Sequence, residues 1–539
     1  MVLNSDSPWL AHAAQNIFLI LLSLAFLPLD LTILFLSYAI RYFFYSGNKP
    51  GVLASGEAKK TILVTGVGMT KGLALARAFY QAGHRVIGAD FEPGFACGRF
   101  STALSGFYTL RKPTTSSSSS GSSSSSKLYV QDLINVIVRE HVDLWVSCSG
   151  VASAVEDGEA KEMIEQQTNC KAVQFNVRIT QMLHEKHTFV EHTKQIGLHV
   201  PETHTITSRE QVEHALQQAA PGRKYILKTI GMNDAARGEI LSTLLPKETP
   251  HATKKYLATL HISPQSPWIL QQFILGQEFC THALVIRGKV CAFVACPSAE
   301  LLMHYRALPA DSALSQAMLQ FTRTYAAAEG ETFTGHLSFD FLVEGDDTDT
   351  TTTTTTQRRR RRDPREIVLY PIECNPRAHT AVCLLTNRNP DMIHAYLELL
   401  NETPNENNNN PEHLATTPTP TTPKEEETNY YWIGHDLLTL LFNPFLSSLT
   451  TEPPPPQHPS FFSFFSFFFS PSFYRAYKHN LLTFLSHVLT WKDGTYEIWD
   501  PLPWFALYHV YWPLRFAMCL VKGTRWSRVN VSTTKMFEC

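Results

Sequence analysis

The residues best placed to do chemistry lie in two apolar segments of the 539-residue chain, 336–343 and 367–377. Side chains alternate between the two faces of a strand, so Asp340 lies opposite the apolar face of the first segment, and Glu373 and Asn375 share one face of the second. If the strands pair as a hairpin, these three side chains converge. Carboxylate and amide oxygens are ligands that Mg²⁺ accepts, with nucleotide phosphates filling the remaining positions. An acid inside an apolar strand favours such a site over ordinary strand-end acids.

Three basic residues could handle phosphate beside that cation. Arg377 follows Asn375 by two residues and could clamp a transferring phosphoryl group. Lys228 is the one lysine in the apolar segment 225–230, and a buried cation needs an anion nearby, either polyphosphate or a structural carboxylate. Lys186 begins the helix that precedes this unit and could contact the same phosphates.

The elements that must position these residues fall into two patterns. The first, over residues 58–180, alternates strands with helices. Its expected strands are 61–65, 86–89 and 143–147, and its expected helices are 73–82 and 128–139. This alternation predicts an α/β domain with an open parallel sheet.

From residue 185 to 400 the pattern changes to an α+β unit. A helix is followed by strands at 225–230 and 268–273 and then by the two segments that carry the acids. Acceptor specificity is expected to depend on residues that include 297–305. Residues 401–480 are expected to be a low-complexity linker and 481–539 an aromatic-rich C-terminal segment.

Polar tracts interrupt these units at 114–126, 348–362 and 401–428. None can bury enough apolar surface to fold alone, so they are expected to be loops. The aromatic-rich stretches 461–469 and 502–521 could lie against a bilayer or pack onto the body.

An apolar run from Ile17 to Ile40 predicts a membrane anchor within residues 1–50, because roughly twenty apolar residues suffice to cross the hydrocarbon layer. Arg41 and the lysines that follow it place the catalytic body in the cytosol by the positive-inside rule. Two alternatives are open: a buried core helix, and a hairpin that turns at residues 28–30. The second is considered because Asp30 is costly in mid-bilayer.

Composition excludes other classes. The net charge of -2 gives no reason to expect nucleic acid as a partner. None of the ten cysteines forms a CxxC pair, which argues against a disulfide framework or zinc ribbon and favours a reducing compartment.

A glycine-rich turn at 65–72 follows a strand and opens a helix, where backbone amides could hold a phosphate. Asp90 stands where dinucleotide-binding folds place a ribose-binding acid, so an NAD(P)-dependent oxidoreductase is an alternative. The Tyr-x-x-x-Lys pair that a short-chain reductase needs occurs near that pattern only at Tyr474 and Lys478, far downstream. The preferred interpretation is that these glycines serve only to form a tight turn.

The order and spacing of five segments resemble the ATP-grasp superfamily. They are Lys186, 225–228, 271–278, 338–341 and 372–377. Residues 371–380 and 500–513 are similar to the branch that contains mycosporine-glycine synthetases and related fungal metabolite enzymes. The resemblance covers residues 61–400 and 481–521 and implies a Rossmann-like pre-ATP-grasp domain followed by an ATP-grasp domain.

The resemblance also implies a role for each matching position. Lys186 and Lys228 would bind ATP phosphates, and Arg377 would meet the γ-phosphate or the acceptor. The hinge around adenine would be formed by Gln271, Gln272, Phe273 and Ile274, and Glu278 would hold the ribose. Mg²⁺ or Mn²⁺ would be held by Asp340, Glu373 and Asn375. The chain departs from the pattern at Gln272, where many members have glutamate, and at Ser338, where D-alanine ligases have arginine. The loop 231–238 has few glycines for a phosphate lid.

What the resemblance implies for function is an ATP- and Mg²⁺-dependent ligase. A carboxylate or enolic oxygen takes the γ-phosphoryl group, and an amine, expected to be an amino acid, displaces phosphate to form a C–N bond. The partners would be a small-molecule acceptor, the amino acid and the membrane, in secondary-metabolite biosynthesis. A small-molecule kinase that stops at phosphorylation is the alternative within enzymes.

Overall fold

The chain is described from a computed structural model. The structure describes residues 3–4, 6–44, 53, 58–91, 95–113, 122–150, 153–229, 243–298, 303–344, 363–386, 390–401, 419–423, 429–442 and 471–539. The loop 231–238, the tract 348–362, the stretch 461–469 and most of 401–428 therefore lie outside the described residues.

The first domain is built on a parallel sheet with strand order β3-β2-β1-β4-β5. Its strands are β1 (Thr61–Thr65), β2 (Arg85–Asp90), β3 (Gly106–Thr109), β4 (Leu144–Val146) and β5 (Lys171–Val173). Its helices are α2 (Thr70–Gln81), η1 (Cys97–Phe100), α3 (Ser122–Glu140) and α4 (Ala154–Gln167). The parallel sheet expected from the alternating pattern is confirmed, and its strands β1, β2 and β4 are buried on both faces, as parallel strands usually are.

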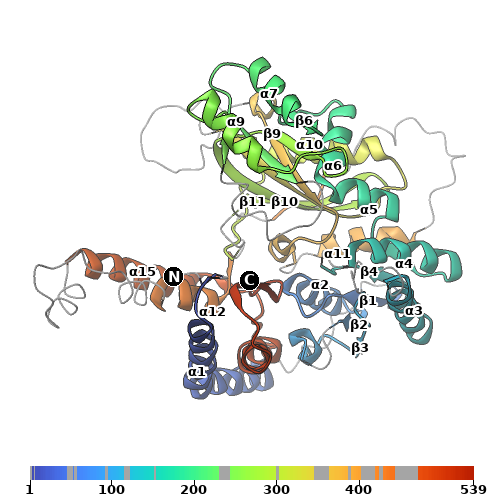
Figure 1. Cartoon of the computed structure of the whole chain (residues 1–539). Coiled ribbons are helices and arrows are strands. Elements are labelled where there is room, and N and C mark those ends of the chain that lie inside the picture. Colours follow the sequence, from blue (N-terminus) through green and yellow to red (C-terminus); the bar gives the residue numbers. More distant parts are fainter. Residues whose placement is uncertain are drawn as a thin grey trace, which may run out of the picture.

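A second sheet has the order β6-β9-β7-β8, and its strands pair in antiparallel fashion. It consists of β6 (Thr203–Ile206), β7 (Tyr225–Thr229), β8 (Leu244–Leu245) and β9 (Trp268–Gln272), with helices α7 (Arg209–Gln218) and α9 (Pro250–Thr259). This unit stands at the top of the molecule in Figure 1. It carries the lysine and the hinge segment that the resemblance assigns to ATP.

The third sheet, β11-β10-β12-β13, is antiparallel and positions the acids. Its strands are β10 (Gly276–Ile286), β11 (Lys289–Pro297), β12 (Gly335–Glu344) and β13 (Tyr370–Asn375), and the helices beside it are α5 (Val177–His184), α6 (Lys186–Gln195) and α10 (Ala313–Glu329). The alternate residues of β12 that are apolar are fully buried in one core with residues of α6 and α10. Burial of that face leaves the polar face of β12 turned away from the core.

One 3-10 helix, η6, precedes β13, and the other remaining elements lie between the third sheet and the C-terminus. They are η6 (Pro364–Glu366), η7 (Thr380–Leu384), α11 (Pro390–Leu397), η8 (Glu398–Leu400), β14 (Tyr430–Tyr431), α12 (Ile433–Asp436), η10 (Leu437–Phe442), α15 (Pro471–Thr490), β15 (Lys492–Asp493), α16 (Leu502–Ala506), η11 (Leu507–Tyr511), α17 (Trp512–Lys522), β16 (Trp526–Asn530) and β17 (Lys535–Glu538). The linker expected at 401–480 thus contains structured segments, because Tyr430, Tyr431 and Trp432 are buried in the body.

The N-terminal helix α1 (Trp9–Phe44) runs without a break through Pro28. The hairpin considered at residues 28–30 is therefore wrong. Figure 1 shows the ribbon of α1 in two stretches of different direction, as expected for a helix with an internal proline. Among the described residues α1 is the helix long and apolar enough to cross a membrane, and the buried residues among its 36 are only His12, Ala13, Asn16, Leu34 and Ser37. A buried core helix therefore does not fit.

Polar residues of α1 recur every seven positions at Asn16, Ser23, Asp30 and Ser37, and each contacts the C-terminal part of the chain. Asn16 Oδ1 accepts a hydrogen bond of 2.9 Å from Trp526 Nε1, and Ser23 Oγ donates one of 2.9 Å to Tyr508 O. Asp30 Oδ2 lies 2.7 Å from His509 Nε2, and Ser37 Oγ lies 2.7 Å from the Tyr496 hydroxyl. Seven residues are about two helical turns, so these side chains form one stripe. The stripe explains why an apolar helix contains Asp30.

Candidate functional site

The two acids face each other across neighbouring strands. In the antiparallel pair β12–β13, Asp340 is the register partner of Glu373 and Ser338 is the partner of Asn375. Asn375 Nδ2 donates to Asp340 Oδ2 at 3.2 Å. The expected strand pairing is confirmed, and it brings the three oxygen donors to one face of the sheet.

Two cationic side chains border this group. Lys186 Nζ, at the first residue of α6, lies 2.7 Å from Glu373 Oε2. Arg377 Nη2 donates to Asn375 Oδ1 at 2.9 Å. The site therefore combines hard oxygen donors with two groups able to bind phosphate oxygens.

The acids repel one another. Burial, together with the neighbouring Glu373 and Glu278 carboxylates, raises the pKa of Asp340 to about 8, although Arg377 and Lys186 oppose the shift. A divalent cation reduces the repulsion between crowded carboxylates of this kind, because its charge favours their ionised forms. The donor set therefore fits Mg²⁺ or Mn²⁺.

Glu278 belongs to the same surface. Its neighbour on β10, Cys280, is the register partner of Asp340, and Glu278 lies two residues away on the same side of the strand. The Glu278 side chain is exposed, and it accepts a hydrogen bond of 2.8 Å from Ser298 Oγ. Ser298 falls in the 297–305 stretch expected to affect acceptor specificity, of which residues 299–302 lie outside the described part.

Lys228 and the hinge segment lie in the other antiparallel sheet. Lys228 Nζ donates to Gln271 Oε1 at 2.6 Å, and Gln271 Nε2 donates to Thr203 Oγ1 at 3.2 Å. The adjacent Gln272 side chain instead accepts from the backbone of Glu202 at 3.2 Å. Only one of the two glutamines therefore shares a face with Lys228.

The other two hinge residues, Phe273 and Ile274, are held in place in different ways. The backbone N–H of Phe273 donates to Lys224 O at 2.8 Å, and Ile274 is 4% exposed. The hinge segment 271–274 covers the last two residues of β9 and the two residues after it, so the chain that leads from β9 into β10 joins the sheet of Lys228 to the sheet of Asp340.

A buried lysine that contacts the backbone next to Arg377 was not recognised in the sequence as part of this region. Lys71 is 1% exposed, and its Nζ donates to Ser149 O at 3.0 Å and to Ala378 O at 2.9 Å. Burial, and to a smaller degree Arg377, lowers its pKa to about 7. Lys71 thus ties the first domain to the segment that follows β13, and nothing local in the sequence marks it as buried.

Three buried histidines, His282, His336 and His379, extend this region. The His282 and His336 ring centroids are 5.4 Å apart, and His379 N donates to His282 Nδ1 at 3.3 Å. Burial lowers the pKa of His336 and of His379 to about 3, so both imidazoles are neutral. Within the described residues, His282 Nε2 and Ser338 Oγ are buried without a hydrogen-bond partner.

The glycine turn is occupied by the protein itself. Asp90 Oδ2 accepts from Gly68 N at 2.7 Å, Thr70 N donates to Ser532 O at 2.9 Å, and Trp432 Nε1 donates to Thr70 Oγ1 at 3.2 Å. A Cβ atom at Gly72 would lie 2.4 Å from Gly66 O. The glycines thus serve close packing, and the Asp90 carboxylate binds the backbone of the turn.

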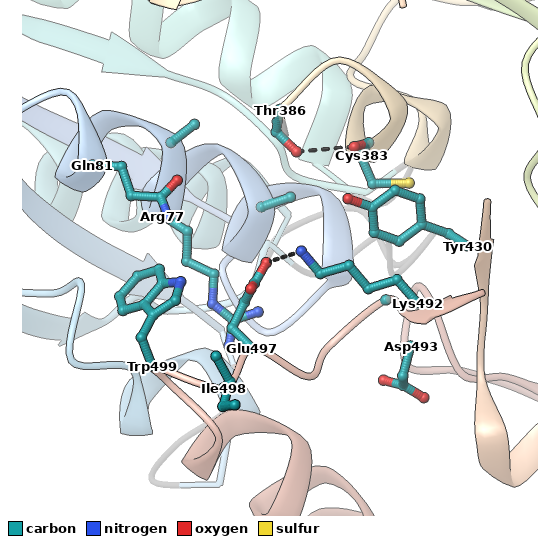
Figure 2. A pocket seen from close by; sticks show the side chains of 13 residues that line it. Arg77, Gln81, Cys383, Thr386, Tyr430, Lys492, Asp493, Glu497, Ile498 and Trp499 are labelled. Atoms are coloured by element: carbon teal, nitrogen blue, oxygen red, sulfur yellow. Dashed lines mark hydrogen bonds and ion pairs between the residues drawn. The ribbon is translucent and has the colours of Figure 1, made fainter. Parts of the chain in front are cut away.

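A cavity of about 210 Å³ lies elsewhere, between α2 and the segment 492–499. Figure 2 shows that charged side chains line it, with Lys492 paired to Glu497. Arg77, also in its wall, is paired to the buried Asp500. The cavity contains none of the residues proposed for nucleotide binding, and Arg77, Lys492 and Glu497 in its wall are already paired.

No protein-family model and no curated protein matches the chain. Among solved structures, the chain is similar to N5-carboxyaminoimidazole synthetase from Staphylococcus aureus complexed with ADP, with 14% identity, a TM-score of 0.42 and coverage of 65% of this chain and 80% of that one. A biotin carboxylase complex from Campylobacter jejuni has 13% identity, a TM-score of 0.43 and coverage of 66% and 74%. An L-amino acid ligase from Bacillus licheniformis has 13% identity, a TM-score of 0.37 and coverage of 60% and 68%. These three TM-scores all lie below 0.5.

Proposed function

We propose that the chain is an ATP- and Mg²⁺-dependent ligase of the ATP-grasp type. The observation that carries this proposal is the pairing of Asp340 with Glu373 on adjacent strands, with the Asn375 amide beside them. Two carboxylates and an amide oxygen on one sheet face, bordered by Lys186 and Arg377, form a set suited to a divalent cation and a polyphosphate.

Each of the site residues would have its own role in binding and reaction. Asp340, Glu373 and Asn375 would hold the cation, which neutralises charge on the phosphates when bound. Lys186 and Lys228 would bind phosphate oxygens, the segment 271–274 would contact adenine, and Glu278 would hold the ribose. Arg377 would stabilise the charge that develops on the γ-phosphoryl group or orient the acceptor.

The proposed reaction has two steps. A carboxylate or enolic oxygen of the acceptor attacks the γ-phosphorus, and ADP leaves. The amine of an amino acid then attacks the activated carbon, inorganic phosphate leaves, the amine loses a proton, and a C–N bond remains. Exclusion of water protects the phosphorylated intermediate. A role in secondary metabolism and a relation to the mycosporine branch are parts of this proposal that rest on the sequence resemblance.

An oxidoreductase is disfavoured because hydrogen bonds within the protein occupy the glycine turn and Asp90. The direct test uses the full-length chain in detergent. MgATP should raise its melting temperature, whereas NADPH should not. The reverse result would refute the ligase proposal.

Ligation is separated from simple phosphorylation by measuring ADP release with acceptor mixtures, in the presence and absence of an amino-acid panel. A ligase should release ADP at a higher rate with one class of amine and form a product that contains it. Amine-independent release, with a stable phosphorylated product, would instead identify a kinase.

We further propose that α1 attaches the protein to a membrane while lying along its surface, with the body in the cytosol. Near the C-terminal end of α1, Arg41 Nη1 donates to Trp499 O. The next residue, Asp500, forms an ion pair with Arg77 of α2, so this end of α1 is connected to α2. Near the N-terminal end, Asn16 contacts Trp526 of β16, whose hairpin reaches Thr70 of α2 through Ser532. Since α2 is only 12 residues long, or about 18 Å, both ends of α1 lie beside the same side of the body.

The surface around α1 supports this orientation. Large exposed apolar side chains gather on α1, α15 and α17, and they include Leu21, Leu24, Phe35, Leu485, Leu489 and Val521. Residues 501–537 contain five basic residues and no acidic residue. Apolar helices interspersed with basic side chains suit an anionic lipid surface.

A further inference from the structure

A second group of metal-binding side chains lies outside the proposed nucleotide site. His304, Asp436 and His487 each offer one ligand atom, and these atoms lie within 4.8 Å of one another. His304 Nε2 is 2.6 Å from Asp436 Oδ1, and His487 Nδ1 is 2.6 Å from Asp436 Oδ2. The residues come from three segments: the chain before Tyr305, helix α12 and helix α15.

The surroundings fix this arrangement. The Asp436 side chain is fully buried, so its carboxylate needs compensating charge. Within the described residues its ion-pair partners are the two histidines. The Trp491 ring packs against both imidazoles, with centroids 4.3 Å from His487 and 5.6 Å from His304. Packing therefore holds the imidazoles toward the carboxylate.

We propose that His304, Asp436 and His487 bind a divalent transition metal of the Zn²⁺ type. Two imidazoles and one carboxylate are ligands preferred by Zn²⁺ or Fe²⁺, whereas Mg²⁺ prefers oxygen ligands. Binding replaces the imidazole protons that point at the carboxylate and requires the three ligand atoms to move closer together around the ion. Three protein ligands leave a coordination position for water or substrate. The exposed fraction of the His304 side chain, 31%, gives the ion access from solvent.

The metal would connect two functional regions. His304 precedes Tyr305, whose ring packs against His379 at 5.8 Å in the buried region behind Arg377. At the other end of the same stretch, Ser298 hydrogen bonds Glu278. His487 lies on α15, which contributes to the exposed apolar surface. A bound ion would therefore link the acceptor-side loop to the helices of the proposed membrane surface.

The test uses full-length protein in detergent, stripped with a chelator and kept in excess Mg²⁺ without nucleotide. Titration with Zn²⁺ should show one tight site, and Co²⁺ should give the visible absorption of a low-coordinate complex. His304→Gln and His487→Gln should each weaken Zn²⁺ binding by at least about 10-fold and abolish the Co²⁺ spectrum. His479→Gln, an exposed position on the same helix, is the matched control and should bind like the wild type.

Folding of each variant is checked by its melting temperature in chelator, where the wild type and the histidine variants should agree within a few degrees. Zn²⁺ should then raise the melting temperature of the wild type and of His479→Gln only. Equal Zn²⁺ affinity in all four proteins would show an adventitious ion and overturn the proposal. Absence of binding to the wild type would leave the cluster as a hydrogen-bonded triad and overturn it equally.

Discussion

Lys186 Nζ lies 2.7 Å from Glu373 Oε2, which joins the start of α6 to the edge strand of the sheet that carries the acids. The two side chains are 33% and 38% exposed, so the pair faces solvent and is easily separated. We expect this pair to exchange partners when MgATP binds: Lys186 would turn to a phosphate oxygen and Glu373 to the cation. The ion pair thus keeps both groups in place before the nucleotide arrives.

Replacement of Glu373 by Gln should lower ADP release by at least about 100-fold, because a neutral amide binds a divalent cation weakly. The measurement is a coupled ADP assay on the full-length protein at saturating Mg²⁺. Glu366→Gln removes an exposed acid seven residues earlier and serves as the control. Activity of Glu373→Gln above half that of the control would contradict the proposed metal site.

Asp340→Asn should separate activity from stability. Burial and the neighbouring Glu373 and Glu278 carboxylates disfavour the ionised form of Asp340, so an uncharged amide at this position fits the site without a cation. ADP release should fall at least about 100-fold, while the melting temperature without Mg²⁺ stays the same or rises. Added Mg²⁺ should narrow the gap in melting temperature between the two proteins. A large fall in melting temperature would instead mean that Asp340 is a structural residue.

Lys228→Met should raise the KM for ATP by about 10-fold or more, since the lysine is proposed to bind phosphate and its contact with Gln271 positions it. The control is Lys224→Met, which lies just before the same strand and whose Nζ donates to Pro246 O. Initial rates over a range of ATP concentrations give the two constants. If both variants change KM equally, then Lys228 has no special role.

The strand pattern could be predicted, but the long-range contacts could not. Alternation placed Asp340 on the polar face of β12 and Glu373 with Asn375 on β13, because a period of two is visible within each segment. The burial of Lys71 depends on carbonyl groups of Ser149 and Ala378, 78 and 307 residues away. The Asp30–His509 contact joins residues 479 positions apart, so the sequence presented Asp30 only as a costly charge in an apolar run. Local pattern reveals the face of a strand; it does not reveal which distant segment covers it.

Lys71 should make stability depend on pH. Its pKa is about 7 in the folded protein and 10.5 ordinarily, so between these values the unfolded chain binds more protons than the folded one. Stability of the wild type should therefore rise with pH across this window, by up to about 1.4 kcal/mol per pH unit from this residue. In Lys71→Met this rise of stability with pH should be absent, whereas in Lys59→Met, which changes an exposed lysine, it should remain. Urea unfolding at pH 7, 8 and 9 measures the effect; parallel pH profiles for wild type and Lys71→Met would contradict it.

Asp30→Leu distinguishes a helix that packs along the body from an isolated span. For an isolated span the substitution removes a charge and should favour the membrane. In the structure Asp30 pairs with His509, whose side chain is 5% exposed, so the substitution leaves a buried imidazole without its acceptor. We expect a loss of about 1–3 kcal/mol of stability, measured as a lower unfolding midpoint in detergent. Leu21→Ala, on the exposed face of the same helix, should have little effect.

The orientation of α1 itself can be tested with one cysteine introduced on each side of it, Ser7→Cys just before the helix and Lys59→Cys 15 residues after its end, in a Cys539→Ser background that removes the exposed native thiol. The protein is bound to sealed vesicles that contain anionic lipid and treated with a membrane-impermeant maleimide. A helix lying along the surface leaves both ends on the outer side, so both cysteines should be labelled to the same extent before and after the vesicles are opened with detergent. A spanning helix would leave one end protected until the detergent is added. Because both ends of α1 are joined to α2 through the C-terminal segment, we expect equal labelling.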